Sequence, residues 1–234
     1  ITIILFLLFN KTLLGTQIST KANYAVIMDY ETGNILLNKF ATERVYPASM
    51  SKLMTLYILF ESIAQGSITL ESEFYVSNKA WRKGGSKMFV EAGSRVKVED
   101  LLKGIIVQSG NDACIVIAEG IAGDEETFAD LMNEKAIELG LTGSNFINST
   151  GWPDENHYMT PLDIAILSKR IIEDFPEFFS LFKQKEYTFN NIKQSNRNPL
   201  LYSYKFADGL KTGYTEISGF SLAATAIRAK RRLI

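Results

Sequence analysis

A serine and a lysine three residues apart can act together in nucleophilic catalysis, provided that a rigid element holds them and donors stabilise the oxyanion. Ser49 and Lys52 have this spacing at the start of residues 48–60, a run that is apolar nearly all round. Such a run predicts a helix buried in the centre of the domain, and side chains at i and i+3 share one helix face. Pro47 suits the start of that helix. The sequence therefore favours Ser49 and Lys52 as a catalytic pair.

The same S-x-x-K spacing occurs twice more, so the spacing alone is a weak signal. Ser94 and Lys97 lie in a polar turn after Gly93, and Ser180 and Lys183 follow an aromatic run. Neither pair stands at the start of a buried helix. We interpret both as structural.

Two further motifs occur once each in the chain. Ser109-Gly110-Asn111 is its only S-x-N, and Lys211-Thr212-Gly213 is its only K-T-G. An S-x-N is common by chance, whereas a K-T-G is rare in a chain of this length. The order S-x-x-K, S-x-N, K-T-G is much harder to obtain by accident than any one of the motifs.

The hydrophobic patterns around these motifs predict strands near both chain ends and helices between them. Strands are expected at 24–30 and 35–37, around a Gly-Asn turn, and again at 187–190, 200–204 and 219–227. Helices are expected at 98–107, 111–121 and 125–139, the last capped by Asp124, and after Thr160-Pro161. Residues 143–158 form a long polar loop of the kind that often carries function. We predict a mixed α/β fold, with a mostly antiparallel sheet built from the two chain ends, flanked by helices, and an inserted helical subdomain.

Composition excludes several classes of function. The formal net charge is −1, which gives no basic surface for a nucleic-acid partner, and we read the short basic run 228–232 as a solvated strand end. Cys114 and His157 are the only residues of their kinds, so the chain can form no internal disulfide and no structural zinc site. Cys114 lies in an apolar run and reads as a small buried hydrophobe. We expect no metal and no cofactor.

The first residues predict export. Residues 1–9 are almost all Ile, Leu and Phe, which is the length of a secretory hydrophobic region and short for a membrane span. We interpret residues 1–20 as the remnant of a signal peptide; a buried N-terminal strand is the alternative. Residues 21–234 would then form the functional domain.

The three motifs together are the signature of class A β-lactamases and penicillin-binding proteins. From about Ala22 to its end, the chain resembles more closely the serine D-alanyl-D-alanine carboxypeptidases, which are low-molecular-mass penicillin-binding proteins. The resemblance rests on residues 46–55, 105–113 and 208–215, with Asn196-Arg197-Asn198 as a further element. It implies the β-lactamase/transpeptidase-like form of the predicted fold.

The resemblance implies four catalytic residues. Ser49 would be the acyl acceptor, and Lys52 its base, kept neutral part of the time by burial and by the nearby Lys211 cation. Ser109 would relay a proton to the leaving amine. Asn111 would orient Lys52 and the substrate amide.

The resemblance also implies a substrate-binding set on the K-T-G strand. Lys211 and Thr212 would recognise the terminal carboxylate of the substrate, with Arg197 nearby. Gly213 completes the motif, and the backbone N–H groups of Tyr214 and of the nucleophile would form the oxyanion hole.

The function implied is removal of the terminal D-Ala from peptidoglycan stem peptides. A β-lactamase is one alternative, but it needs a deacylating glutamate in an E-x-x-L-N context, whereas Glu155 is followed by Asn156, His157 and Tyr158. A non-catalytic wall-binding protein on the same fold is another. His157 could form a triad with Ser49 and an aspartate, Asp154 or Asp163, but Lys52 already supplies a base. Trp81 and residues 84–86 could form a mobile rim or an ordinary loop.

The expected partners are peptidoglycan stem peptides, with β-lactam antibiotics as covalent inhibitors. The resemblance places such an enzyme in the periplasm or on the outer face of the cytoplasmic membrane. It also implies that the family's catalytic domain continues past Ile234 and ends in an amphipathic membrane anchor. We therefore expect a domain truncated at its C-terminus, with membrane association only through an anchor absent from this chain.

Overall fold

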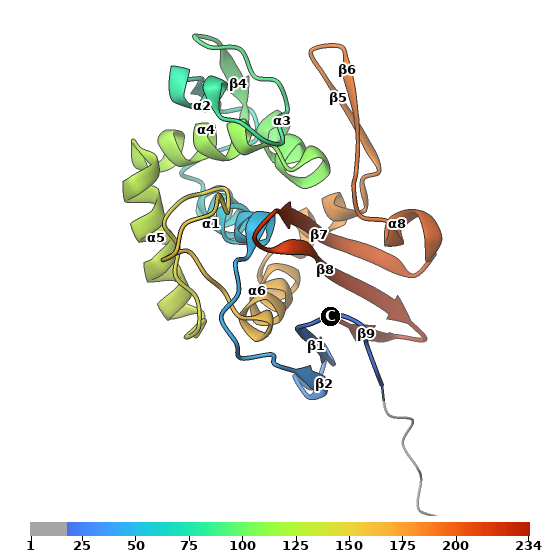
Figure 1. The fold of residues 1–234 in the computed structure, drawn as a ribbon. Coiled ribbons are helices and arrows are strands. Elements are labelled where there is room, and N and C mark those ends of the chain that lie inside the picture. The colour runs from blue at the N-terminus through green and yellow to red at the C-terminus, as the bar shows by residue number, and fades with distance from the viewer. Residues whose placement is uncertain (1–17) are drawn as a thin grey trace, which may run out of the picture.

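Strands from the two ends of the chain form one antiparallel sheet in the computed structural model, which describes residues 18–234 (Figure 1). The N-terminal hairpin pairs β1 (Ala25–Met28) with β2 (Ile35–Lys39). The C-terminal strands β7 (Ala207–Thr215), β8 (Gly219–Arg228) and β9 (Arg231–Leu233) pair in that order. An antiparallel bridge between Asp29 and Leu233 joins β9 to the hairpin. The order across the sheet is therefore β7-β8-β9-β1-β2, as expected for a sheet built from both ends.

The buried helix predicted after Pro47 is α1 (Lys52–Ala64), and it is entered through a 3-10 turn, η1 (Ala48–Ser51). The first nine residues of α1 are all buried. Phe60 stacks on Phe178 with ring centroids 4.8 Å apart, next to Phe175 and Phe182. The core thus surrounds α1 and holds the segment that carries Ser49 rigidly.

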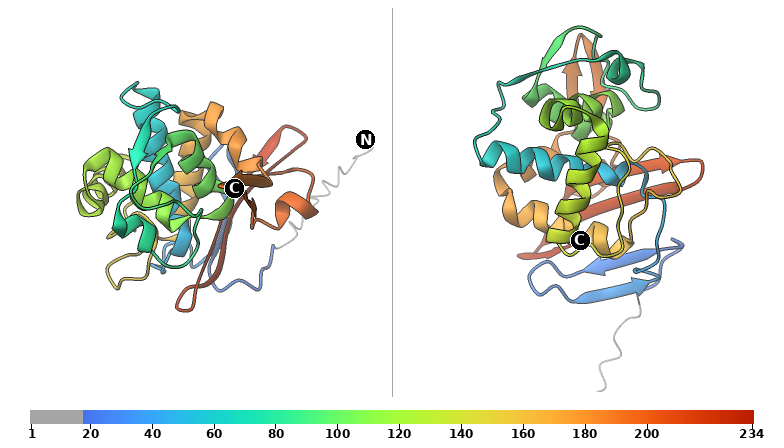
Figure 2. Two further views of the ribbon diagram at one scale, coloured as in Figure 1. Left: turned by 90° about the horizontal axis from the view of Figure 1, so that it is seen from above. Right: turned by 90° about the vertical axis from the view of Figure 1, so that its left-hand side faces the viewer.

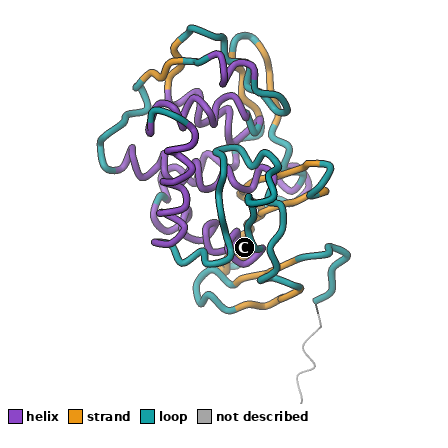
Figure 3. The backbone as a smooth tube through the Cα atoms, turned by 60° about the vertical axis from the view of Figure 1, so that its left-hand side comes forward, coloured by secondary structure: helices purple, strands orange, loops and turns teal. Residues whose placement is uncertain are grey.

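The other elements lie between the two parts of the sheet in sequence. The helices and helical turns are α2 (Asn78–Arg82), α3 (Val98–Lys103), η2 (Gly104–Gln108), α4 (Asn111–Ala122), α5 (Glu125–Glu138), α6 (Pro161–Asp174), α7 (Pro176–Phe179), η3 (Ser180–Lys183) and α8 (Leu200–Ser203). Two small two-stranded antiparallel sheets pair β3 (Glu73–Tyr75) with β4 (Arg95–Lys97) and β5 (Glu186–Phe189) with β6 (Ile192–Ser195). Figures 2 and 3 show the long helices gathered to one side of β7 and β8. No helix within residues 18–234 is both long enough and apolar enough to cross a membrane.

Two helix starts follow directly from capping chemistry. The Asp124 carboxylate accepts a hydrogen bond from the Thr127 N–H at 2.8 Å, and the Thr160 hydroxyl accepts one from the Asp163 N–H at 3.0 Å. Each cap satisfies a backbone donor that has no partner within the helix. Helices α5 and α6 therefore begin where the sequence predicted.

The strand predicted at 200–204 is wrong, because these residues form the short helix α8. Pro199, at its N-cap, has φ −66° and ψ −25°, which is already helical. The Asn198 side chain accepts a hydrogen bond from the Leu200 N–H at 3.0 Å. Local capping thus outweighs the strand-like apolar pattern.

The N-terminal prediction can be compared with the structure only in part. Most of the proposed signal peptide remnant, residues 1–17, lies outside the described residues. The hairpin predicted to follow it is present as β1 and β2.

Candidate active site

Ser49 lies on the 3-10 turn η1 and is half-buried, with Lys52 as the first residue of α1. In a 3-10 helix the side chains at i and i+3 eclipse one another, so this turn aligns the pair more closely than the predicted α-helical turn would. The Lys52 Nζ donates to the Ser49 Oγ at 2.7 Å. Ala48, just before the serine, has the left-handed φ of 48°, an unfavourable backbone conformation that is typical of functional sites.

Lys52 is completely buried, and burial lowers its pKa to about 8. A substantial fraction of the amine is therefore neutral near physiological pH and able to accept a proton. Its second acceptor is the backbone carbonyl of Thr150, at 2.7 Å. This geometry suits a base that takes the proton from Ser49.

Ser109 follows the π-helical turn η2 and adopts the left-handed φ of 64°. Its hydroxyl is buried and has no hydrogen-bond partner among the described residues. Asn111 begins α4; its Nδ2 donates to the Gly84 carbonyl at 2.8 Å and its backbone N–H to the Ser86 carbonyl at 2.7 Å. The S-x-N motif thus presents a free hydroxyl beside an amide that is tied to the 84–86 loop.

The K-T-G motif lies on β7, which has one neighbouring strand, β8, within the described chain. A Cβ on Gly213 would lie 3.2 Å from the Ala48 Cβ and 2.7 Å from the Ser221 Oγ, so glycine allows β7 to pack against η1. Tyr214 turns its ring outward against Phe220, with centroids 4.5 Å apart. The strand therefore carries its motif directly alongside the turn of Ser49.

Lys211 is buried beside Lys52, and burial followed by the Lys52 charge lowers its pKa well below the usual value. Its Nζ donates to the Thr212 carbonyl at 3.1 Å. A bound carboxylate would favour the charged form of this amine again. Lys211 is therefore suited to hold an anionic group of a ligand.

Arg197 lies on the segment between β6 and α8, and its Nη1 donates to the Ser86 Oγ at 2.7 Å. The next residue, Asn198, is fully buried and donates through Nδ2 to the Gly209 carbonyl at 2.9 Å. This second contact ties the arginine segment to β7. Arg197 adds positive charge that contributes to the lowered pKa of both Lys52 and Lys211.

One cleft connects these groups. The predicted site residues that line it are Ser49, Ser109, Asn111, Arg197, Thr212, Gly213 and Tyr214. Lys52 and Lys211 are buried and do not line the cleft. Among the described residues that line it, Glu216 alone carries a carboxylate, and it lies in the turn between β7 and β8.

Sequence reasoning missed Thr150, because it acts through a backbone carbonyl. The only available signal was its place in the polar loop 143–158. Within that loop the Asn148 Oδ1 accepts hydrogen bonds from the N–H groups of Thr150, Gly151 and Trp152, at 3.1, 2.9 and 3.0 Å. The segment 148–152 is thereby folded into a tight turn against Lys52.

His157 does not form a triad with Ser49. It is buried, and its Nε2 lies 2.7 Å from the Ser51 Oγ, while its Nδ1 accepts a hydrogen bond from the Ile147 N–H at 3.2 Å. Burial lowers its pKa to about 4, so the ring is neutral. His157 is a structural link between the polar loop and η1.

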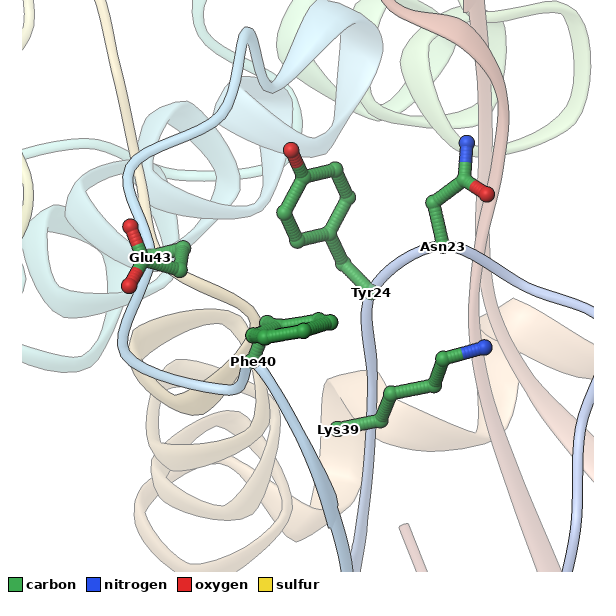
Figure 4. A pocket seen from close by; sticks show the side chains of 5 residues that line it. All are labelled: Asn23, Tyr24, Lys39, Phe40 and Glu43. Carbon is green, nitrogen blue, oxygen red and sulfur yellow. The ribbon is translucent and has the colours of Figure 1, made fainter.

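A smaller hollow lies next to the cleft and shares two lining residues with it, Asn23 and Tyr24. Figure 4 shows Tyr24 and Phe40 between Glu43 on one side and Asn23 and Lys39 on the other. The two rings meet edge to face, with centroids 6.3 Å apart. This hollow contains no pair of a nucleophile and a base. Within residues 18–234, no group of His, Cys, Asp and Glu side chains is arranged to hold a metal.

An antiparallel sheet lies beside a buried helix that is entered through S-x-x-K, and S-x-N and K-T-G meet at the same cleft. This arrangement is typical of the fold shared by penicillin-binding proteins and class A β-lactamases. The family model of peptidase S11, D-alanyl-D-alanine carboxypeptidase, matches residues 11–234, and the chain belongs to this family. The family resemblance and the fold class predicted from the sequence are therefore confirmed.

Individual proteins agree with this assignment. D-alanyl-D-alanine carboxypeptidase DacC of Escherichia coli is 41% identical over 223 residues, which cover 92% of this chain and 56% of that protein. Penicillin-binding protein 5 of Haemophilus influenzae superposes with a TM-score of 0.91 at 38% identity, covering 94% of this chain and 65% of that one. Penicillin-binding protein D2 of Listeria monocytogenes, solved in its ampicillin-bound form, superposes with a TM-score of 0.82 at 26% identity, covering 91% and 87%. The chain thus spans little more than half the length of its curated relative.

Proposed function

We propose that residues 21–234 are the catalytic domain of a serine-type D-Ala-D-Ala carboxypeptidase, which removes the terminal D-Ala from peptidoglycan stem peptides. The observation that carries this proposal is the 2.7 Å contact between the Lys52 Nζ and the Ser49 Oγ on a rigid, buried mount. Membership of the S11 family supports the choice of substrate. Because peptidoglycan lies outside the cytoplasmic membrane, the enzyme would act in the periplasm or on the outer face of that membrane.

In acylation, the Ser49 Oγ attacks the carbonyl carbon of the penultimate D-Ala while neutral Lys52 takes its proton. The backbone N–H groups of Ser49 and Tyr214 stabilise the oxyanion. Ser109, whose hydroxyl has no hydrogen-bond partner within the described residues, passes a proton to the amine of the departing D-Ala and regains one from the Lys52 ammonium, which becomes neutral again. The peptide C–N bond breaks and an ester to Ser49 remains. Water then hydrolyses this ester and releases the shortened peptide.

Arg197, which lines the cleft, and Lys211, which is buried on the K-T-G strand behind it, would select the free C-terminal carboxylate. Lys211 and Arg197 supply charge, and the Thr212 hydroxyl supplies a further donor. A carboxylate that enters beside Lys211 restores its ammonium form and so strengthens its own binding.

A β-lactam presents a strained amide and a carboxylate to the same groups, so β-lactams would acylate Ser49. The ampicillin-bound form of the Listeria relative supports this. Glu155 is exposed and does not line the cleft, which gives no support to the β-lactamase alternative. The intact Ser49–Lys52 contact likewise gives no support to the alternative of a non-catalytic wall-binding protein.

The test uses labelled penicillin and a D-Ala release assay on the wild type, Ser49→Ala and Glu155→Gln. We expect stable covalent label on the wild type and on Glu155→Gln, none on Ser49→Ala, and D-Ala release by the two labelled proteins. Rapid loss of label from the wild type, together with trapping in Glu155→Gln, would identify a β-lactamase instead. No label on any folded protein would support a wall-binding role.

A further inference from the structure

The Thr150 carbonyl determines how Lys52 faces Ser49. A neutral amine has two N–H groups and one lone pair, so an N–H donated to Thr150 leaves the lone pair free to point towards the serine hydroxyl. Both Nζ contacts measure 2.7 Å. The same carbonyl stabilises the ammonium that forms when Lys52 takes the proton. Whatever holds this carbonyl in place therefore influences the base.

The adjacent residue, Ser149, is completely buried and held from two sides. Its carbonyl accepts a hydrogen bond from the Thr55 hydroxyl at 2.7 Å, and Thr55 lies on the same helix as Lys52. On the other side, one oxygen of Glu125 accepts hydrogen bonds from the Ser149 N–H at 3.2 Å and from its hydroxyl at 2.8 Å. Glu125 thus anchors Ser149, the residue before Thr150, while Thr55 holds the peptide unit next to the one whose carbonyl faces Lys52.

Glu125 is a buried acidic residue, and acidic side chains are rarely buried unless they are paired. Its side chain is only 8% exposed, and its second oxygen lies 2.9 Å from the Lys79 Nζ. Burial tends to raise its pKa, but hydrogen bonds from Lys79 and Ser149, with the Lys79 charge, bring the pKa below its usual value. The carboxylate is therefore ionised at neutral pH, and as an anion it is a strong acceptor for the two Ser149 donors.

We propose that Glu125 is a positioning residue for Lys52, which acts through Ser149 to hold the Thr150 carbonyl against the Lys52 Nζ. Glu125 itself does not line the cleft or touch the reacting atoms. Nothing in the S-x-x-K, S-x-N and K-T-G motifs assigns it a role. The proposal rests on Lys52 being the base in the proposed function.

Several other groups also influence the charge on Lys52. They are Cys114 and Asp112 on α4, Arg197 at the cleft, Lys83 at the end of α2, and the buried Lys211 on β7. None of these contacts Glu125 or Ser149 by a hydrogen bond or an ion pair in the described chain. Glu125→Ala also removes a negative charge that acts on Lys83 and Cys114 without contact. Glu125→Gln removes the same charge but keeps an acceptor oxygen for Ser149, so comparing the two variants separates the Thr150 contact from the charge.

The test follows the second-order rate of acylation by labelled penicillin as a function of pH, with thermal unfolding in parallel. Glu125→Ala should lower the plateau rate by about tenfold to a hundredfold, because the base is misplaced. It should also move the rising limb of the pH–rate profile to lower pH. The Lys52 ammonium loses the Thr150 carbonyl as an acceptor, which lowers the pKa of Lys52. Glu125→Gln keeps an oxygen for Ser149 and should recover most of both effects. Ser149→Ala, a milder change, should move the limb in the same direction and gives a second measure if Glu125→Ala does not fold.

Asp124→Ala is the matched control, because Asp124 caps the same helix start but does not contact Ser149. It should lower thermal stability and leave the pH profile unchanged. If Glu125→Ala and Ser149→Ala lower the rate only in proportion to folded protein, with the limb unmoved, the role is structural and the proposal is overturned. If the wild type itself is not acylated, the proposed function fails first, and this proposal falls with it.

Discussion

Gly151 lies where the polar loop meets the turn that carries the nucleophile, and its replacement by alanine is a sharp test of the site. A Cβ at this position would lie 1.7 Å from the Ala48 carbonyl oxygen and 3.0 Å from the Ser51 Oγ. An ordinary C···O contact is about 3.3 Å, so one of the two backbones must retreat by roughly 1.6 Å. Either movement separates groups that now meet at 2.7 Å around Lys52.

The expected magnitudes follow from two separate effects. Gly151 has φ +79°, where an L-residue costs about 1 kcal/mol or slightly more, and the clash with Ala48 adds about 1–3 kcal/mol of overpacking. We therefore expect the free energy of unfolding to fall by about 2–4 kcal/mol. A displacement of an ångström or more in the catalytic geometry should slow acylation by about a hundredfold or more.

Gly140→Ala is the matched control, because Gly140 has a similar φ of +74° but no neighbour within 4 Å of an added Cβ. It should lose about 1 kcal/mol of stability and keep the wild-type acylation rate. Chemical denaturation and penicillin acylation are measured on both variants under conditions in which each is folded. Wild-type acylation by folded Gly151→Ala would show that close packing of the loop against η1 does not set the catalytic geometry.

Three further outcomes are expected. Burial lowers the pKa of Lys52 to about 8, and only its neutral form can accept the Ser49 proton, so the acylation rate should rise with pH up to about 8 and then level off. A rate that is independent of pH from about 6 to 9 would exclude Lys52 as the base. Lys211→Ala should cost about 2–4 kcal/mol in kcat/KM, and amidating the terminal D-Ala should then harm the variant much less than the wild type. An equal penalty in both would remove Lys211 from the carboxylate site. His157→Gln should lose about 1–3 kcal/mol of stability, because the buried Ser51 hydroxyl loses its hydrogen-bond partner, and it should keep its acylation rate. A loss of about a hundredfold in rate without loss of stability would instead make His157 catalytic.

The motif residues could be predicted from the sequence because their chemistry lies in their side chains. The buried helix, the capped helix starts at Asp124 and Thr160, and the sheet made from both chain ends were also predictable, since each follows from hydrophobic pattern or local capping. The catalytic roles assigned to Ser49, Lys52 and the other motif residues remain predictions that the experiments above will test.

The features that the sequence did not predict depend on backbone conformation and on backbone carbonyl groups. The pattern of side chains along the sequence carries little information about either. Every residue has a backbone carbonyl, so no sequence motif could single out the one at Thr150. The left-handed conformations of Ala48 and Ser109 are forced by tertiary packing on residues with no preference for them. The helix at α8 depends on an asparagine cap and a proline that a strand-like apolar run concealed.

The placement of β9 has a consequence for how the chain folds. This strand lies between β8 and the N-terminal hairpin, and the Asp29 carboxylate meets the Arg231 Nε at 2.7 Å across 202 residues of sequence. Contacts of such long range are entropically expensive to form and slow folding. The β1–β2 hairpin must wait until nearly the whole described chain has been synthesised before it gains its sheet neighbour. The central helix α1 can bury its surface against α4, α5 and α6 earlier, so we expect the helical part to become ordered first and the cleft to be completed only when the sheet closes.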